Sequence, residues 1–242
     1  MIDYDVYAII VNELYMKSRQ QALLDIDNEL NNDNDNKPKM KALKSGLKAV
    51  NFVYGEIDIH SFIHVLNKVG INDENETYID LGCGSGVSLI AALMMVYYNK
   101  KHNKLMKFKN VIGIDLLSMK IEECNKTVSY INSNVSDFLS NKPNGYYEYL
   151  IQKIPEINVI LHNFLQYDWK SADVVYACAT CFAQDLLVQL EIKLKELKVG
   201  SRIILLDSLI LQSQDNMFQL IDTYVCMTTW GRGNAYIYLK IA

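Results

Sequence analysis

The sequence lacks any long hydrophobic run, although half of its 242 residues are hydrophobic. No stretch approaches the roughly 20 apolar residues that span a membrane. The first residues, M-I-D-Y-D-V-Y, are acidic where a signal peptide would be basic. Cysteine is also sparse, and five thiols in a chain of this size predict reduced, half-buried side chains rather than a disulfide framework. We therefore expect a soluble intracellular protein, long enough for one large α/β domain.

Positive charge is not in excess either. The net charge of −4 argues against nonspecific binding of nucleic acid by the whole surface. Two lysine-rich runs, Lys37–Lys48 and Lys100–Lys109, contain no acidic residue. Such runs are usually solvated faces, and they would favour an acidic or nucleic-acid partner only if both lay beside an active site. Contact with nucleic acid is therefore left open.

Residues that typically bind metals are few. Cys178 and Cys181 form a C-x-x-C, but the sequence has no second such pair. Cys178 follows a predicted strand within an apolar run, which favours packing. His60 and His64 lie four residues apart on a predicted helix, without the intervening Glu of a zinc-protease motif. We interpret both histidines as surface or supporting residues and predict no metal site.

The most informative segment that is present is Thr77–Gly86, T-Y-I-D-L-G-C-G-S-G. An apolar run ends in Asp80, glycines follow at Gly82, Gly84 and Gly86, and a helical apolar pattern comes next. A strand that ends in a glycine turn and continues into a helix is how α/β proteins bind nucleotides. Glycine allows unusual backbone angles and lets a ligand touch the main chain. The alternative is a tight turn that binds nothing.

The spacing of this segment distinguishes between nucleotides. A dinucleotide fold would require Gly or Ala at position 87, where the chain has Val87, and the Gly-Lys-Ser/Thr of a P-loop is missing. The loop has no Lys or Arg to meet a phosphate, whereas Asp80 suits a cationic ligand. S-adenosylmethionine carries an ammonium, a sulfonium and no phosphate. We therefore predict that Asp80 and the three glycines bind S-adenosylmethionine; the pattern D-x-G-x-G-x-G resembles the first motif of class I methyltransferases.

The rest of the chain alternates between strand and helix patterns. A helical N-terminal region, 1–70, is expected to pack on an S-adenosylmethionine-binding methyltransferase domain, 71–242. After the first strand, helices are expected at Val87–Asn99, from the second strand to about Tyr130, and at Gln184–Lys198. This alternation predicts a Rossmann-like α/β fold, with a mostly parallel seven-stranded sheet, helices on both faces and an antiparallel last strand. The expected strands are Thr77–Leu81, Val111–Asp115, Ile157–His162, Ala172–Cys178, Arg202–Asp207, Thr223–Thr229 and Asn234–Ile241.

The carboxyl ends of these strands should hold the ligand, as in other open α/β sheets. Asp115 ends the second strand and is placed to accept hydrogen bonds from ribose hydroxyls; its alternative role is a helix N-cap. Asn163 and Phe164 end the third strand. We expect Asn163 to pair with the adenine edge and Phe164 to stack on the ring, although Phe164 is also explained as a core residue. At the end of the fourth strand, Ala177–Phe182, the acceptor atom would meet the methyl group.

Methyl transfer needs alignment and exclusion of water more than covalent help, because a sulfonium is already a strong electrophile. An amine acceptor must arrive uncharged, which a dry aromatic channel promotes by disfavouring the ammonium. Trp230, Tyr236 and Tyr238 could wall such a channel. The two tyrosines share one face of a strand, and packing on the sheet explains them equally well. We take Tyr236 as a candidate catalytic residue.

Several segments together resemble the non-SET histone lysine methyltransferases of the disruptor-of-telomeric-silencing family. The resemblance runs from about Val53 to the C-terminus and implies a lysine N-methyltransferase acting on protein, with a histone substrate and a nuclear location as its most specific form. It also implies that Tyr54 and Glu56 contact the amino-acid end of the cofactor. The matching segments are V-Y-G-E, D-L-G-C-G-S-G, I-G-I-D, N-F-L, V-V-Y-A-C-A-T-C-F, L-K-V-G-S-R-I-I and T-W-G-R-G.

The chain departs from the family at informative positions. Cys178, our second candidate catalytic residue, stands where the family has an asparagine in the reaction pocket. Ile57 replaces a small polar residue, and Asn163 replaces an aspartate. The chain also lacks the long basic tail that nucleosome binding favours. Two alternatives therefore stay open: a class I methyltransferase acting on RNA or a small molecule, and a catalytically silent cofactor-binding protein.

Overall fold

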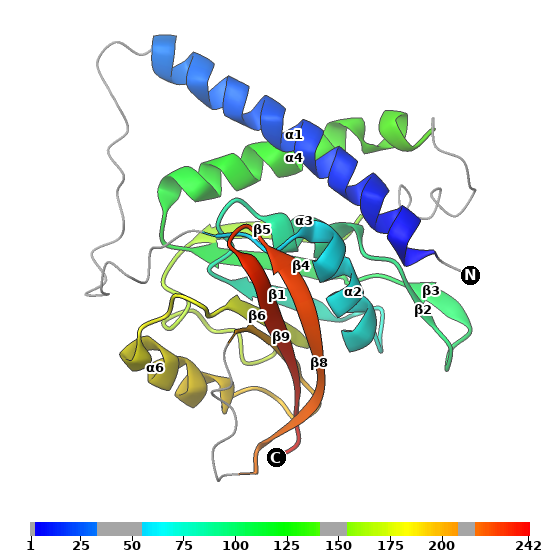
Figure 1. Ribbon diagram of the computed structural model, residues 1–242, viewed down its shortest axis with the longest axis vertical. Coiled ribbons are helices and arrows are strands. Elements are labelled where there is room, and N and C mark those ends of the chain that lie inside the picture. The colour runs from blue at the N-terminus through cyan, green and yellow to red at the C-terminus, as the bar shows by residue number, and fades with distance from the viewer. Residues whose placement is uncertain (1–2, 33–54, 141–153, 208–215) are drawn as a thin grey trace.

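The computed structural model describes residues 3–32, 55–140, 154–207 and 216–242. Its main feature is a seven-stranded sheet in the order β5-β4-β1-β6-β7-β9-β8 (Figure 1). The strands from β5 to β7 are parallel, and β9 runs antiparallel to both of its neighbours. The predicted fold class is thus confirmed. The strands are β1 Thr77–Leu81, β4 Asn110–Asp115, β5 Glu156–Leu161, β6 Val174–Cys178, β7 Arg202–Leu206, β8 Phe218–Thr228 and β9 Gly231–Lys240.

Helices cover both faces of the sheet because the inner strands are apolar on both faces. In β1, Tyr78 belongs to a hydrophobic cluster with α2, α3 and α4 on one face. Its neighbour Ile79 points to the other face and joins a cluster with α6. The helices are α1 Tyr4–Asn32, α2 Ile59–Val69, α3 Val87–Met94, α4 Ser118–Ser140 and α6 Gln184–Leu194.

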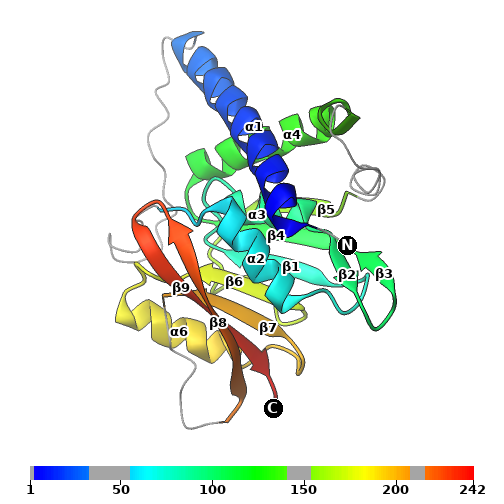
Figure 2. The same ribbon diagram turned by 45° about the vertical axis from the view of Figure 1, so that its right-hand side comes forward.

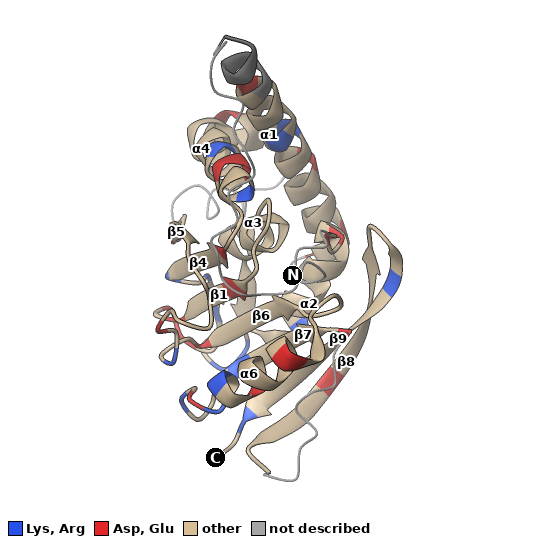
Figure 3. Cartoon of the chain, turned by 90° about the vertical axis from the view of Figure 1, so that its left-hand side faces the viewer, with Lys and Arg blue, Asp and Glu red and all other residues tan. Residues whose placement is uncertain are grey.

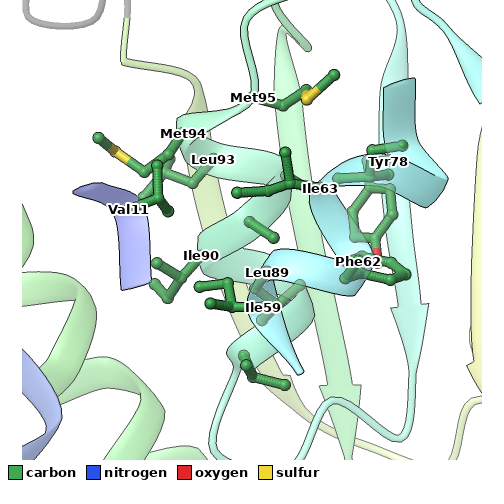
Figure 4. Packing of buried hydrophobic residues seen from close by; sticks show 14 of the residues in the cluster. Val11, Ile59, Phe62, Ile63, Tyr78, Leu89, Ile90, Leu93, Met94 and Met95 are labelled. Carbon is green, nitrogen blue, oxygen red and sulfur yellow. The ribbon is translucent and has the colours of Figure 1, made fainter. Parts of the chain in front are cut away.

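Helix α1 forms an outer layer that crosses α4 and also contacts α2 and α3 (Figure 2). Tyr7, Val11 and Leu14 recur at helical spacing and are fully or almost fully buried. Val11 lies in the same cluster as Ile59 of α2 and Ile90 of α3 (Figure 4). The N-terminal helix is therefore continuous with the main core. Residues 33–54 of the predicted helical N-terminal region lie outside the described residues, and the domain boundary at residue 70 stays a prediction.

One predicted helix, Val87–Asn99, is wrong in its second half. Helix α3 ends at Met94, and the chain turns into a two-stranded antiparallel ribbon of β2 Tyr97–Asn99 and β3 Lys104–Met106. Aromatic and β-branched residues at 96–98 favour a strand. The side chain of Asn99 then accepts hydrogen bonds from the backbone amides of residues 101 and 102, which forms the turn. Helix α4, in contrast, runs ten residues beyond the predicted end at about Tyr130.

Candidate cofactor site

A cavity lies at the carboxyl ends of β1, β4 and β6. In the sheet, β1 lies between β4 on one side and β6 on the other. The chain therefore adds β4 and β5 on one side of β1 and then crosses to add β6 and β7 on the other. Such a change of direction is where open α/β sheets bind ligands. Most of the site residues predicted from the sequence line this cavity: Glu56, Asp80, Gly82, Gly84, Asp115, Phe164 and Cys178.

The glycine loop between β1 and α3 has left-handed backbone at each predicted glycine. Gly84, at φ 54°, turns its N–H toward Asp115 and donates a hydrogen bond to Oδ2 at 2.8 Å. Gly86, at φ 90°, precedes α3, and a Cβ there would lie 2.3 Å from the Sγ of Cys124. Gly84 therefore shapes the cavity wall, whereas Gly86 allows close packing of α3 on α4.

Asp80 is the buried charge of the site, with 2% of its surface exposed. Its Oδ2 accepts a hydrogen bond from the Ser88 hydroxyl at the start of α3. Its Oδ1 is buried and has no hydrogen-bond partner among the described residues. Burial, with a smaller contribution from nearby Asp115, raises the pKa of Asp80 to about 7. A buried carboxylate oxygen without a partner fits a cationic ligand group, as the sequence predicted.

Asp115 ends β4 and already has two backbone partners. Its Oδ1 accepts from the Leu117 amide at 2.8 Å, and its Oδ2 accepts from the Gly84 amide. The bond to Leu117, one residue before α4, resembles the capping role that was the alternative for this residue. An ionised carboxylate offers about four lone-pair sites, so the two backbone bonds leave room for ribose hydroxyls. Burial raises the pKa of Asp115 above its usual range.

Glu56 reaches the cavity from the loop that precedes α2. This loop is held to the β8–β9 turn by two hydrogen bonds: the Glu56 amide donates to Thr229 Oγ1 at 3.0 Å, and the Thr229 amide donates to the Glu56 carbonyl at 2.9 Å. Gly55 lies against the Trp230 ring so closely that a Cβ would meet it at 2.4 Å. Tyr54 lies outside the described residues, so its predicted contact stays a prediction.

Charged residues of both signs gather where α1 crosses α4 (Figure 3), and one of them fixes the Glu56 side chain. Arg19 of α1 pairs with Glu56 Oε2 through Nη1 at 2.8 Å and with Glu123 Oε1 through Nε at 2.8 Å. The Ser85 hydroxyl of the glycine loop donates to Glu56 Oε1. Sequence reasoning missed Arg19 and Ser85. Arg19 is 37 residues from Glu56 and carries no motif.

Two residues that follow β5 were predicted to contact adenine, and one of them lines the cavity. Phe164 is buried and lines the cavity, with its ring stacked on that of Phe182 at a centroid distance of 5.9 Å and an angle of 22°. The Asn163 side chain accepts from the Leu165 amide at 3.0 Å. Asn163 is not among the described residues that line the cavity. Its pairing with adenine stays a prediction. Phe182, which the sequence placed only in the acceptor segment Ala177–Phe182, is a further aromatic beside Phe164.

Cys178 lines the cavity at the end of β6, where the acceptor is expected. Burial raises the pKa of its thiol to about 11, so the side chain is neutral at neutral pH and is no thiolate nucleophile. Tyr236 is paired with Leu205 of β7 and packs on the hydrophobic cluster of that face. Among the described residues that line the cavity, Tyr236 is missing. Its catalytic role remains a prediction. The contacts that it makes are those of a side chain that packs on the sheet.

The fold and the cavity define a class I S-adenosylmethionine-dependent methyltransferase. A family model described as the histone methylation protein DOT1 matches residues 35–229, and the chain belongs to this family. It is therefore an enzyme that uses S-adenosyl-L-methionine as methyl donor, and the orphaned oxygen of Asp80 fits that cationic cofactor.

The chain is similar to solved structures of low sequence identity. A class I S-adenosylmethionine-dependent methyltransferase described as putative, from Listeria monocytogenes, has a TM-score of 0.51 and 13% identity, over 83% of this chain and 64% of that one. An rRNA methylase from Streptococcus thermophilus has a TM-score of 0.46 and 14% identity, over 76% and 94%. The structure of Methanocaldococcus jannaschii Trm5 in complex with adenosine has a TM-score of 0.47 and 11% identity, over 76% of this chain and 49% of that one. No curated protein matches the sequence.

Membrane insertion by a helix has no support in the described part of the chain. None of the helices there combines the length and the hydrophobicity that crossing a bilayer requires.

Proposed function

We propose that this protein transfers the methyl group of S-adenosylmethionine to a lysine side chain of a protein, with a histone as the first acceptor to test. Membership of the DOT1 family supports the acceptor class. The observation that carries the proposal is the buried Asp80 oxygen, which lacks a partner in the described structure and lies beside the glycine loop. A nuclear location would follow if the acceptor is a histone.

The residues around the cavity suggest how the cofactor is held. Asp80 accepts from the ammonium of the methionine part, and Glu56 faces the same end, held by Arg19. Asp115 accepts from the ribose hydroxyls. Phe164, stacked with Phe182, contacts the adenine ring. In this arrangement the charged groups bind the cofactor, and the aromatic groups exclude water from it.

The acceptor end of the cavity is apolar. Tyr176, Cys178 and Phe182 line it, and burial keeps both the phenol of Tyr176 and the thiol of Cys178 protonated at neutral pH. These side chains therefore align the acceptor and disfavour an ammonium, so that lysine enters as the neutral amine. Its lone pair would bond to the methyl carbon as the bond from that carbon to the sulfonium sulfur breaks, with S-adenosylhomocysteine as the leaving group.

The test is incubation with labelled S-adenosylmethionine and separate histone, other protein, RNA and metabolite fractions. We expect label on protein, located on lysine by mass spectrometry, and none with the Gly84→Arg variant. Label confined to RNA or metabolites would reject the lysine acceptor while keeping the methyltransferase. A folded protein that shows no S-adenosylmethionine binding by calorimetry would reject the proposed cofactor site as well.

The substitution Cys178→Asn tests the placement of the acceptor. Because Cys178 lies at the acceptor end of the cavity, this change should alter kcat by about tenfold or more and leave the Kd of S-adenosylhomocysteine within about twofold. An altered Kd with unchanged kcat would place Cys178 in cofactor binding instead.

A further inference from the structure

Two histidines and one aspartate from separate helices meet at the surface of the protein. His60 and His64 lie one turn apart on α2, and Asp5 lies in the first turn of α1. The Nε2 of His64 is 3.0 Å from Asp5 Oδ1, and the Nε2 of His60 is 3.5 Å from the same oxygen. The sequence pattern left these histidines without a third ligand because Asp5 is 59 residues away from His64.

We propose that Asp5, His60 and His64 form a binding site for Zn²⁺. The three donor atoms all lie within 4.8 Å of one another. Zn²⁺ takes imidazole nitrogen and carboxylate oxygen at about 2.0–2.2 Å, and a tetrahedral arrangement at these lengths separates donor atoms by roughly 3.3–3.6 Å. The observed separations of 3.0 and 3.5 Å are close to that range. Two histidines at positions i and i+4 present both rings on one face of a helix.

The surroundings position one of the two histidines. The His64 ring lies nearly parallel to the Tyr224 ring of β8, at 15° and a centroid distance of 6.3 Å. The next turn of α2 carries Lys68, whose charge is matched by Asp222 at 2.7 Å, so it opposes a bound cation less. The Asp5 side chain is 73% exposed and that of His60 39%, which leaves access for the metal and space for water as a fourth ligand.

The role that follows is structural. A metal ion here would link the start of α1 to α2, and α1 carries Arg19 to the Glu56 side chain. The site lies outside the residues that line the cofactor cavity in the described structure, so it takes no part in methyl transfer. Binding of Zn²⁺ should therefore raise the stability of the protein with or without cofactor.

The test is calorimetric titration of tag-free, chelator-treated full-length protein with Zn²⁺ near neutral pH. We expect one Zn²⁺ per chain and a rise in Tm. The variants His60→Asn and His64→Asn should each weaken binding by at least about tenfold, and Asp5→Asn should weaken it less. The matched control is His102→Asn, an exposed histidine in the β2–β3 turn, which should bind as the wild type does.

The alternative is that Zn²⁺ binds to the thiols of Cys178 and Cys181. Co²⁺ absorption and the variant Cys181→Ser distinguish that site from the proposed one. If Asp5, His60 and His64 bind the metal, the Co²⁺ spectrum should show no thiolate charge-transfer band, and Cys181→Ser should bind Zn²⁺ as the wild type does. Binding that survives both histidine substitutions, or that is lost in Cys181→Ser, would overturn the proposal. So would a wild-type protein that takes up no stoichiometric Zn²⁺. Far-UV circular dichroism of the histidine variants checks that lost binding does not reflect unfolding.

Discussion

The two ends of strand β1 treat buried charge in opposite ways. Glu76, just before the strand, is 6% exposed and pairs with Arg202 of β7, with Oε2 and Nη2 2.6 Å apart. Asp80, near the other end of the strand, is 2% exposed and leaves Oδ1 without a hydrogen-bond partner in the described structure. A buried charge is normally paired because its desolvation is otherwise uncompensated. The unpaired end is therefore the end that awaits a ligand.

The paired end has a structural task. Arg202 also donates to the carbonyl of Gly70 at 2.8 Å and to that of Val69 at 3.3 Å. These bonds tie the end of α2 to the amino ends of the parallel strands. One end of the sheet thus uses buried charge to fix the chain, and the other keeps it available for a cation.

The largest effect on function should come from Gly84→Arg. A side chain at this position enters the cavity, so affinity for S-adenosylmethionine should fall more than about 100-fold, about 2.8 kcal/mol. The positive φ adds roughly 1–2 kcal/mol of backbone strain. Calorimetry with S-adenosylhomocysteine measures the change. Gly200→Arg is the matched control, because Gly200 also has positive φ but lies in open space at the opposite end of the sheet.

The largest effect on stability should come from Arg202→Met. This change leaves Glu76 buried without its ion partner, and we expect a loss of about 3–5 kcal/mol in the free energy of unfolding. Lys198→Met is the control, since its partner Asp173 is at the same end but the Lys198 side chain is 48% exposed; about 1 kcal/mol or less is expected there. Equal losses in urea denaturation would contradict the assignment of Arg202.

Asp80→Asn should produce a pH-dependent effect on stability. The folded pKa of about 7 lies above the ordinary value of 3.8. Protonation of Asp80 therefore stabilises the cofactor-free fold fully below about pH 4, and this contribution is lost as pH rises through about 7. The difference corresponds to at most about 4 kcal/mol. Asp80→Asn should flatten that part of the stability curve in thermal melts at several pH values.

Cofactor binding should respond to the same group in the opposite direction. The ionised carboxylate binds the cation, so wild-type affinity should rise with pH through about 7 relative to Asp80→Asn, which should bind about 1–3 kcal/mol more weakly at high pH. Comparing the two proteins at each pH removes the titration of the ligand itself. Parallel affinity curves would contradict a role for Asp80 in holding the ammonium.

The smallest effect is expected for Arg19→Met. Loss of the Arg19–Glu56 pair removes one of the contacts that position the Glu56 side chain, while Ser85 still donates to Oε1. Cofactor affinity should therefore fall only about fivefold, about 1 kcal/mol. Arg19→Lys should recover part of this loss and should not restore the simultaneous contacts with Glu56 and Glu123. An unchanged Kd together with reduced stability would make Arg19 a purely structural residue.

Much of the cavity was predictable because its residues follow strands directly. Asp80, Asp115 and Cys178 each lie at or near the end of a β-strand, and parallel strands bring such residues to one edge. The antiparallel last strand was equally predictable from the sequence, since two strand patterns follow each other without an intervening helix.

The rest depended on contacts between distant segments, which no local pattern reveals. Arg19 reaches Glu56 only because α1 crosses α4, and Asp5 meets His64 only because α1 begins beside α2. The position of Asn163 after a strand also did not predict that its side chain accepts from the Leu165 amide of its own loop. The ribbon β2–β3 was missed because an apolar helix pattern continued into residues that favour strands.

Helix α1 ends before residue 35, where the match to the family model begins. A recombinant fragment trimmed to that match would uncover the surface that Tyr7, Val11 and Leu14 now shield from solvent. It would also release Glu56 from its guanidinium partner. Trimming at the family boundary should therefore yield an aggregation-prone product whose weak cofactor uptake says nothing about the catalytic competence of the intact chain.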